Sequence, residues 1–223
     1  YTNLQQLLTY DKTFADVHHV SALLGHESYT TTSYVVGASK SRMFSNDNAE
    51  LSGSVVDGEN AYSSKSMYNN EGYLGRVQYD YANRIFLNAS FRRDASSRFH
   101  PDNRWGNFWS LGAAWLINEE SWFNAPWMDM LKFKASYGSQ GNDAIGNYRY
   151  TDTYSVAPLN GQIATTFETK GNKDITWETN ENFNTGIEFG LWGSRLSGSI
   201  EYFYRKTSDM LFFFNVATSS GYS

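Results

Sequence analysis

The feature that most constrains this 223-residue sequence is an alternation of apolar and polar side chains with a period of two residues. In residues 71–81, Val77 and Tyr79 share one side of an extended chain, and Arg76 and Gln78 share the other. Successive side chains of a β-strand point to opposite faces, so this period is typical of strands that are apolar on one face only. The pattern predicts an all-β fold with eight strands, at residues 3–10, 13–27, 71–81, 85–94, 109–117, 131–138, 182–191 and 196–205.

The connections between these strands fall into a short class and a long class. Tight turns are expected at residues 11–12, 82–84 and 192–194, and a moderate one at 118–129. The other connections are long and rich in Asn, Gly, Ser and Thr, at residues 28–70, 95–104 and 139–176. Short turns at one end of the strands and long loops at the other are typical of outer-membrane β-barrels, whereas a soluble meander has no physical reason to sort its loops.

Aromatic residues also favour an antiparallel transmembrane β-barrel. Phe, Trp and Tyr make up 17% of the chain, while charged residues reach only 18%, below the roughly 25% of ordinary soluble domains. Trp105, Trp109 and Trp115 share parity on one strand. From the first to the last of them a tilted strand rises about 25 Å, the height of the apolar band between two aromatic girdles. No stretch of the sequence approaches the roughly 18 consecutive apolar residues of a membrane-spanning helix.

Two other folds are compatible with the same alternation. A soluble glycan-binding β-sandwich would use the Trp residues as its core, but it needs a second sheet to cover the apolar faces. A complete eight-strand barrel with a structural role would be filled by side chains, yet Gly112, Gly186 and Gly190 share the inward face.

Charge and composition exclude several classes of function. The formal net charge of −5 gives no basic footprint for nucleic acid, and the absence of Cys excludes disulfides, thiol nucleophiles and Cys-ligated zinc. His18 and His19 point to opposite faces of a strand, and no Ser/His/Asp motif accompanies the four His residues. We therefore expect no enzymatic activity, no cofactor and no metal site.

One run of residues resembles a known family. The segment 92–99, Arg-Arg-Asp-Ala-Ser-Ser-Arg-Phe, is followed at 103–106 by Asn-Arg-Trp-Gly, and together they resemble the central barrel signature of the SusC/RagA group of TonB-dependent outer-membrane transporters. Ala95 stands where the family usually has Gly, and Trp109 where it usually has Pro. Further segments resemble the family in its order and spacing: 22–27, 135–142, 177–184, 201–203, 209–211 and 220–222.

The resemblance implies a barrel of about 22 strands that is filled by a plug domain. Residues 1–223 would then form part of that barrel, with the plug, the segment that contacts TonB and the remaining strands outside this sequence. The implied function is TonB-dependent import of a glycan or an oligopeptide across the outer membrane of a Gram-negative bacterium. The implied partners are a SusD-like surface lipoprotein that acts as a lid, the TonB complex and the lipid bilayer.

Two groups of residues are candidates for a site. Arg92, Arg93, Asp94, Arg98 and Arg104 either line the lumen or anchor a loop through ion pairs, and their place in a family-wide signature favours anchoring. A second group of loop aromatics is suited to stacking on sugar rings or packing against peptide side chains, and equally to packing within the loop: Tyr148, Tyr150, Tyr154 and Phe167.

Overall fold

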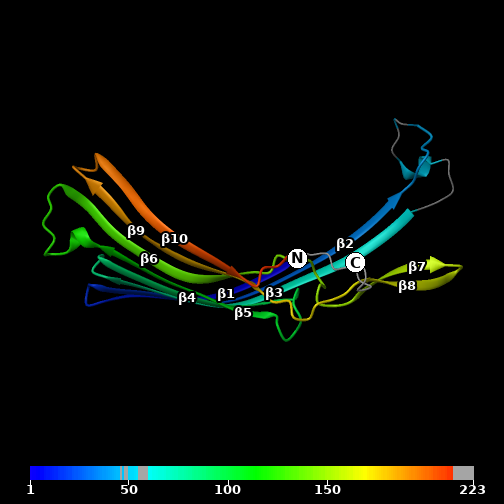
Figure 1. Cartoon of the computed structure of the whole chain (residues 1–223), viewed down its shortest axis with the longest axis horizontal. Helices are drawn as coiled ribbons and strands as arrows, with labels where there is room; N and C mark the ends of the chain where they lie inside the picture. The colour runs from blue at the N-terminus through cyan, green and yellow to red at the C-terminus, as the bar shows by residue number, and fades with distance from the viewer. Residues whose placement is uncertain (46, 48–49, 55–59, 213–223) are drawn as a thin grey trace.

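The computed structural model describes residues 1–45, 47, 50–54 and 60–212, so the segment 220–222 lies outside the described residues. Eight of its ten strands form one antiparallel sheet in the order β1-β2-β3-β4-β5-β6-β9-β10, which curves to give a concave and a convex face (Figure 1). The strands of this sheet are β1 Thr2–Phe14, β2 His18–Ser39, β3 Asn60–Tyr81, β4 Ile85–Ser96, β5 Trp105–Leu116, β6 Met128–Asn142, β9 Glu178–Leu191 and β10 Leu196–Ser208.

The arrangement of the strands separates the three folds that the sequence left open. In the described part of the chain, the only other sheet is the two-stranded hairpin of β7 (Thr153–Leu159) and β8 (Gln162–Thr169). This hairpin is too small to cover the main sheet, so the chain is not a β-sandwich. β1 and β10 form the two edges, and no pairing between them occurs among the described residues, so the eight strands do not close into a small barrel. The prediction of an all-β partial barrel is confirmed.

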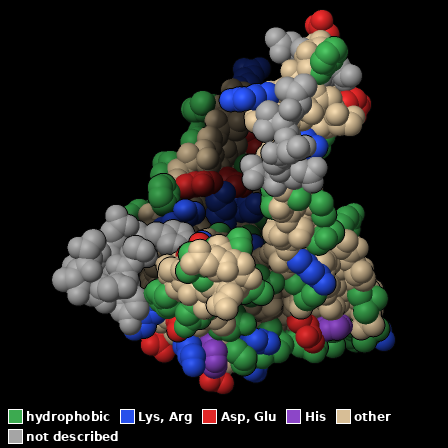
Figure 2. All heavy atoms as spheres, turned by 90° about the vertical axis from the view of Figure 1, so that its right-hand side faces the viewer, with side chains coloured by type: hydrophobic (Ala, Val, Ile, Leu, Met, Phe, Trp, Pro, Cys, Tyr) green, Lys and Arg blue, Asp and Glu red, His purple; other side chains and the backbone are tan. Residues whose placement is uncertain are grey.

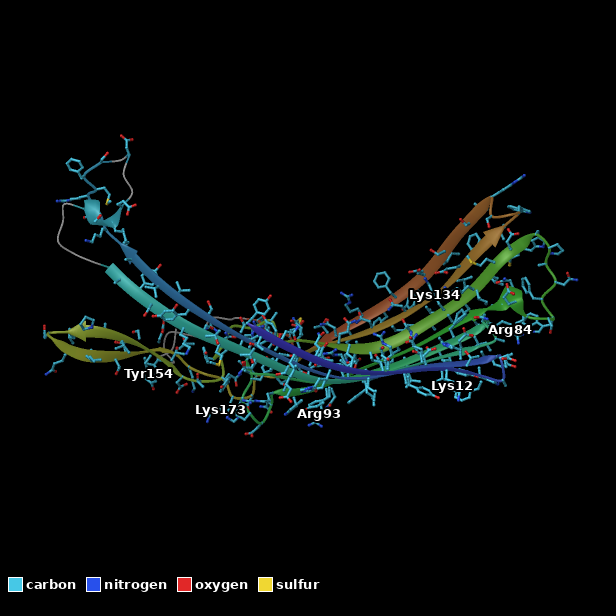
Figure 3. All side chains as sticks on the ribbon, turned by 180° about the vertical axis from the view of Figure 1, so that it is seen from behind. Lys12, Arg84, Arg93, Lys134, Tyr154 and Lys173 are labelled. Atoms are coloured by element: carbon cyan, nitrogen blue, oxygen red, sulfur yellow. The ribbon has the colours of Figure 1, made fainter. Side chains whose placement is uncertain are left out.

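The register of the ladder sorts side chains into two chemically different faces. Val77, Ala89, Leu111, Tyr137 and Phe183 stand opposite one another in one row across five strands. This row lies on the convex face, where Leu111 is 55% exposed and Val77 49%. Figure 3 shows Lys134 on the concave side and Arg93 on the convex side, in agreement with the alternation along their strands.

The turn end of the sheet, where the short connections lie, differs from expectation at one place. The turn between β1 and β2 comprises Ala15, Asp16 and Val17 rather than residues 11–12. Its first two residues, Ala15 and Asp16, have φ values of 49° and 61°. This is the left-handed backbone that the two central residues of a tight hairpin turn require. Neither residue is a Gly or Asn, so the sequence carried no strong turn signal there. Ala82 and Asn83 adopt the same conformation, with φ values of 53° and 55°, in the turn that was predicted correctly.

The loop end of the sheet, where the long connections lie, contains more strand than expected. β2 and β3 each run for 22 residues and stay paired up to Ser39 and Asn60, so only residues 40–59 connect them. The extra length of β2 consists mainly of Thr, Ser, Tyr and Val, which have high β-propensity except for Ser. The expected loop 139–176 likewise contains the β7–β8 hairpin, whose turn is Asn160-Gly161.

Buried side chains are few and lie at the loop end. In the described part of the chain, the buried hydrophobic residues are Ala95, Phe99, Phe108 and Trp177, and only the last three pack as a cluster. The body of the sheet is one layer thick and buries no apolar interior of its own. The two 3-10 turns, Leu51–Gly53 and Ile117–Glu119, are three residues each, and no helix among the described residues is long and apolar enough to cross a membrane.

Candidate functional site

The buried cluster at the loop end, here called the loop hub, joins two connections of the chain to strand β5. Its aromatic part is Phe99, Phe108 and Trp177, with ring centroids 5.3 to 5.4 Å from Trp177 to each Phe. The Trp177 indole N–H donates to the backbone carbonyl of Arg104 at 2.8 Å. The segment before β9 is therefore fixed to the start of β5, which is 73 residues earlier in the sequence.

The polar part of the loop hub centres on the Asp143 carboxylate. It accepts hydrogen bonds from the hydroxyl of fully buried Ser96 at 2.6 Å and from that of Tyr68 at 2.8 Å. Arg98 donates to the Asp143 carbonyl at 2.9 Å and lies over the Tyr68 ring at 4.4 Å. Burial, followed by the hydrogen bond to Asp143, raises the pKa of Tyr68 to about 12, so this phenol remains a donor. Charge-assisted bonds of this kind fix geometry, and they hold the 143–177 connection against β3 and β4.

Arg92 and Asp94 form a second charged group on the concave face. Arg92 Nε and Nη2 donate to the two Asp94 oxygens at 3.2 and 3.0 Å, and Nη2 also reaches Glu27 at 2.9 Å. Glu27 is on β2 and Arg92 on β4, so the ion pair crosses β3 at Gly72. A Cβ atom at Gly72 would collide with Asp94 Oδ1 and come within 3.1 Å of Arg92 Nη2. The missing side chain of Gly72 therefore makes room for the pair.

Arg93 lies on the opposite face from its two neighbours. Its guanidinium stacks over the Trp105 ring at 5.1 Å, and the Tyr73 ring packs against the same indole at 6.2 Å. The signature run 92–98 is thus divided among three places, namely the concave face (Arg92, Asp94), the convex face (Arg93) and the loop hub (Arg98).

Another charged group on the concave face was not singled out from the sequence. Lys134 on β6 pairs with Glu188 on β9 at 2.7 Å and with Glu201 on β10, and Lys132 pairs with Glu188 at 3.3 Å. Figure 2 shows acidic and basic side chains together in the hollow of the sheet. The sequence shows that these Lys and Glu residues lie on the polar faces of their three strands. It does not show that they pair, because a long connection separates β6 from β9.

The loop aromatics that were candidates for a substrate vestibule make contacts with other residues of the loop end. Tyr148 accepts a hydrogen bond from the Met67 backbone N–H at 3.0 Å, and the Tyr150 ring meets His100 edge-on at 5.8 Å. Tyr154 and Phe167 pack edge-to-face at 5.6 Å across the β7–β8 hairpin. Tyr148 and Tyr154 remain 43% and 56% exposed, so each still offers ring surface to a ligand.

The site as a whole is built from ion pairs and aromatic rings. The structure brings together a charged concave surface, the buried loop hub and partly exposed rings at the same end of the sheet. Within the described ranges, no three His, Asp or Glu side chains come together in a way that could hold a metal ion.

Known proteins share this arrangement. The family model of the TonB dependent receptor-like β-barrel matches residues 1–223. TonB-dependent receptor P39 of Formosa agariphila is 30% identical over 98% of this chain, and TonB-dependent receptor SusC of Bacteroides thetaiotaomicron is 34% identical over 62% of it. The solved structure of the RagAB peptide transporter matches 99% of the chain with a TM-score of 0.90 at 28% identity.

The chain corresponds to only a part of each of these proteins. The chain spans 21% of the P39 receptor, 15% of SusC and 25% of the matched RagAB chain. The family consists of transporters and receptors rather than enzymes, and its members are outer-membrane β-barrel proteins. The resemblance drawn from the signature run is confirmed by a match that extends over every strand. The chain belongs to the TonB-dependent receptor β-barrel family and is of the SusC/RagA type.

Proposed function

We propose that this chain forms part of the barrel wall and the loop-end vestibule of an importer that carries a glycan or an oligopeptide across the outer membrane of a Gram-negative bacterium. The observation that carries the proposal is the division of one curved sheet into an exposed apolar convex face and a charged concave face. An apolar face of this kind is stable against lipid, and a charged face is stable against water or a polar plug. The turn end then lies in the periplasm and the loop end outside the cell.

In the whole protein, the eight strands would be a segment of a barrel of about 22 strands around a plug domain. Energy would reach the protein from the TonB complex through regions outside this chain. A SusD-like surface lipoprotein would close over the loop end. This arrangement is supported by the likeness to SusC and RagAB and by the stiff elements at the loop end, namely the paired extension of β2 and β3 and the β7–β8 hairpin (Figure 1).

Within this proposal the two groups of candidate residues have different roles. Arg92, Asp94 and Arg98 hold the wall and the loops in register through ion pairs, while Arg104 contributes its backbone carbonyl to the loop hub. The exposed ring faces of Tyr148 and Tyr154 contact substrate in the vestibule, because flat aromatic surfaces suit both sugar rings and peptide side chains.

The test uses the full-length protein in its native outer membrane. Accumulation of labelled oligopeptides and of labelled oligosaccharides is measured in cells with and without TonB, and in cells that lack the protein. We expect one of the two substrate classes to accumulate only when both the protein and TonB are present. Equal accumulation without TonB, or recovery of the protein outside the outer-membrane fraction, would contradict the proposal.

A further inference from the structure

A polar pocket of about 300 Å³ lies at the loop end of the main sheet. Its walls are two rows of side chains that share parity with Tyr73 and Arg93, so the pocket opens on the convex face. The six residues of the two rows are Ser28, Glu71 and Ala95, and Thr30, Asn69 and Ser97. The convex side of a barrel is the side that faces lipid, and a polar pocket there is not explained by transport through the lumen.

The pocket begins where the aromatic girdle ends. Trp105 is the cross-strand neighbour of Ala95, and the Tyr73 ring packs against the Trp105 ring with the centroids 6.2 Å apart. Arg93 lies over the same indole at 5.1 Å. Trp, Tyr and Arg gather at the boundary between hydrocarbon and headgroups, so the pocket is at the height of the lipid headgroups.

The pocket holds charges of both signs. Arg104 lines the side of the pocket next to β5. Glu71 lies on β3, two strands or about 10 Å from β5 and between Ser28 and Ala95. There it accepts from Tyr73 at 2.7 Å and contacts His26 at 3.4 Å. A guanidinium at the wall of a polar pocket favours an anionic acceptor such as a phosphate, because its N–H groups donate charge-assisted hydrogen bonds. The carboxylate, the Asn amide and the hydroxyls at the other positions suit the hydroxyl groups of a sugar.

An apolar groove of about 500 Å³ lies below the pocket on the same face. Small side chains leave this space: Ala113 and Ala135 stand opposite each other in the row next to Leu111 and Tyr137, and Ala89 stands beside Leu111. From Ala95 to Ala89 the strand rises about 20 Å, which is within the reach of one acyl chain. The polar pocket therefore lies at the height of the headgroups, and the apolar groove lies beneath it at the height of the hydrocarbon.

We propose that the pocket binds the phosphorylated sugar headgroup of an outer-leaflet glycolipid and that one of its acyl chains lies in the groove. This inference rests on the proposed function, because it requires the convex face to be in the membrane. Arg104 receives the phosphate, Glu71 accepts from sugar hydroxyls, and Ala89, Ala113 and Ala135 leave room for the chain. The lipid is a resident of the wall and is not transported.

The experiment uses the full-length protein in nanodiscs, with native mass spectrometry to count retained lipids. The probes are a phosphorylated glycolipid, the same glycolipid without phosphate, and its deacylated headgroup. Arg104→Gln removes the cation and keeps a polar amide on a shorter side chain, and Ser28→Trp fills the pocket. Arg205→Gln is the matched control, because Arg205 lies on the concave face and bonds to Asn182 at 2.7 Å.

We expect the unaltered protein and Arg205→Gln to retain one phosphorylated glycolipid and to retain the dephosphorylated lipid on the order of tenfold less well. Arg104→Gln should lose this preference for phosphate, and Ser28→Trp should retain neither lipid. The inference is overturned if the unaltered protein retains no glycolipid, if Arg205→Gln loses as much as Arg104→Gln, or if the deacylated headgroup binds as well as the lipid. Failure of the protein to enter nanodiscs contradicts the proposed function, whereas normal entry and import without retained glycolipid contradicts this inference alone.

Discussion

At the scale of single residues, the parity of a side chain determines which solvent it meets. Leu111 and Ser110 are neighbours on β5, yet Leu111 is 55% exposed on the convex face and the Ser110 hydroxyl bonds to that of Ser90 at 2.7 Å on the concave face. Substitutions at these two neighbouring positions therefore compare the convex face with the concave face at nearly the same depth in the membrane.

Leu111→Arg is expected to destabilise the barrel in the membrane by about 2 to 4 kcal/mol, because it moves a charge into the hydrocarbon near the midplane. Ser110→Arg is expected to cost far less, since it forfeits one neutral hydrogen bond of about 1 kcal/mol and faces a polar interior. The measurement is the amount of folded full-length protein in the outer membrane, assessed by resistance to unfolding in cold detergent. Equal losses for the two variants would contradict the assignment of the faces.

The loop hub depends on positions without a side chain, of which Gly141 is one. A Cβ atom at Gly141 would collide with the Phe108 ring, which is buried in the hub. Gly141→Ala is therefore expected to overpack the cluster by about 1 to 3 kcal/mol. Gly75→Ala is the control, because its Cβ would meet Leu24 at an ordinary 3.5 Å. Limited proteolysis of intact cells should cleave residues 143–177 faster in Gly141→Ala and at the original rate in Gly75→Ala; equal rates in both would refute the role of Gly141.

At the scale of elements, the body of the sheet and the turns at 82–84 and 192–194 could be predicted, whereas the turn between β1 and β2 and the contacts of the loop end could not. The alternation through Val77 and Leu111 was sufficient to place the strands, because lipid and lumen impose opposite chemistry on alternate residues. The turn at Ala15 and Asp16 was missed because no Gly or Asn marks its left-handed backbone. The hydrogen bond from Trp177 to Arg104 was missed because it joins positions 73 residues apart, and single-sequence periodicity carries no information on such distances.

The charged group on the concave face could be predicted only in part, because only some of its contacts are local in the sequence. Arg92 and Asp94 share a face at a spacing of two residues, so their pairing follows from strand geometry. The third member, Glu27, depends on the register of β2 against β3 and β4 and could be found only in the structure.

The β7–β8 hairpin is an element that the wall does not need. It shares no ladder with the main sheet, and its ends are close, since Thr153 stands opposite Thr169 and Asp152 accepts from the Gly171 N–H at 2.8 Å. Replacing residues 153–169 by a short Gly-Ser linker should leave assembly in the outer membrane unchanged and lower substrate uptake, because loop elements carry contacts rather than the ladder. Unchanged uptake at normal surface abundance would remove the hairpin from the vestibule.

A finer test of the vestibule changes single rings. Tyr148→Ala, Tyr150→Ala and Tyr154→Ala should each lower uptake while assembly remains normal. Tyr148→Phe separates the two roles of that residue, since it keeps the ring and removes the acceptor of the Met67 N–H. If the ring contacts substrate, Tyr148→Phe retains most of the uptake that Tyr148→Ala loses; loss of equal size in both assigns Tyr148 to loop structure.

At the scale of the whole molecule, the described part of the chain has two open edges and one exposed apolar face. Among the described residues, β1 and β10, 13 residues each, are paired on one side only, and on the convex face Ile200 is 72% exposed. Open edges cannot exist in lipid and are templates for aggregation in water.

Residues 1–223 expressed alone are therefore expected to be insoluble without detergent. If, as proposed, the strands that close the barrel lie outside this chain, detergent should disperse the chain without giving a cooperative thermal transition. The measurements are sedimentation, size-exclusion chromatography and circular dichroism. A monodisperse monomer with a sharp two-state melt in plain buffer would contradict the whole-barrel interpretation.

The ion pair that passes over Gly72 has an evolutionary consequence. Glu27, Arg92 and Asp94 lie on β2 and β4, and the pair they form occupies the place where a side chain of β3 would stand. A side chain at position 72 therefore requires the Asp94 carboxylate and the Arg92 guanidinium to move. Descendants of this sequence that replace Gly72 should thus also change Asp94 or Arg92, so that residues on two neighbouring strands are inherited together.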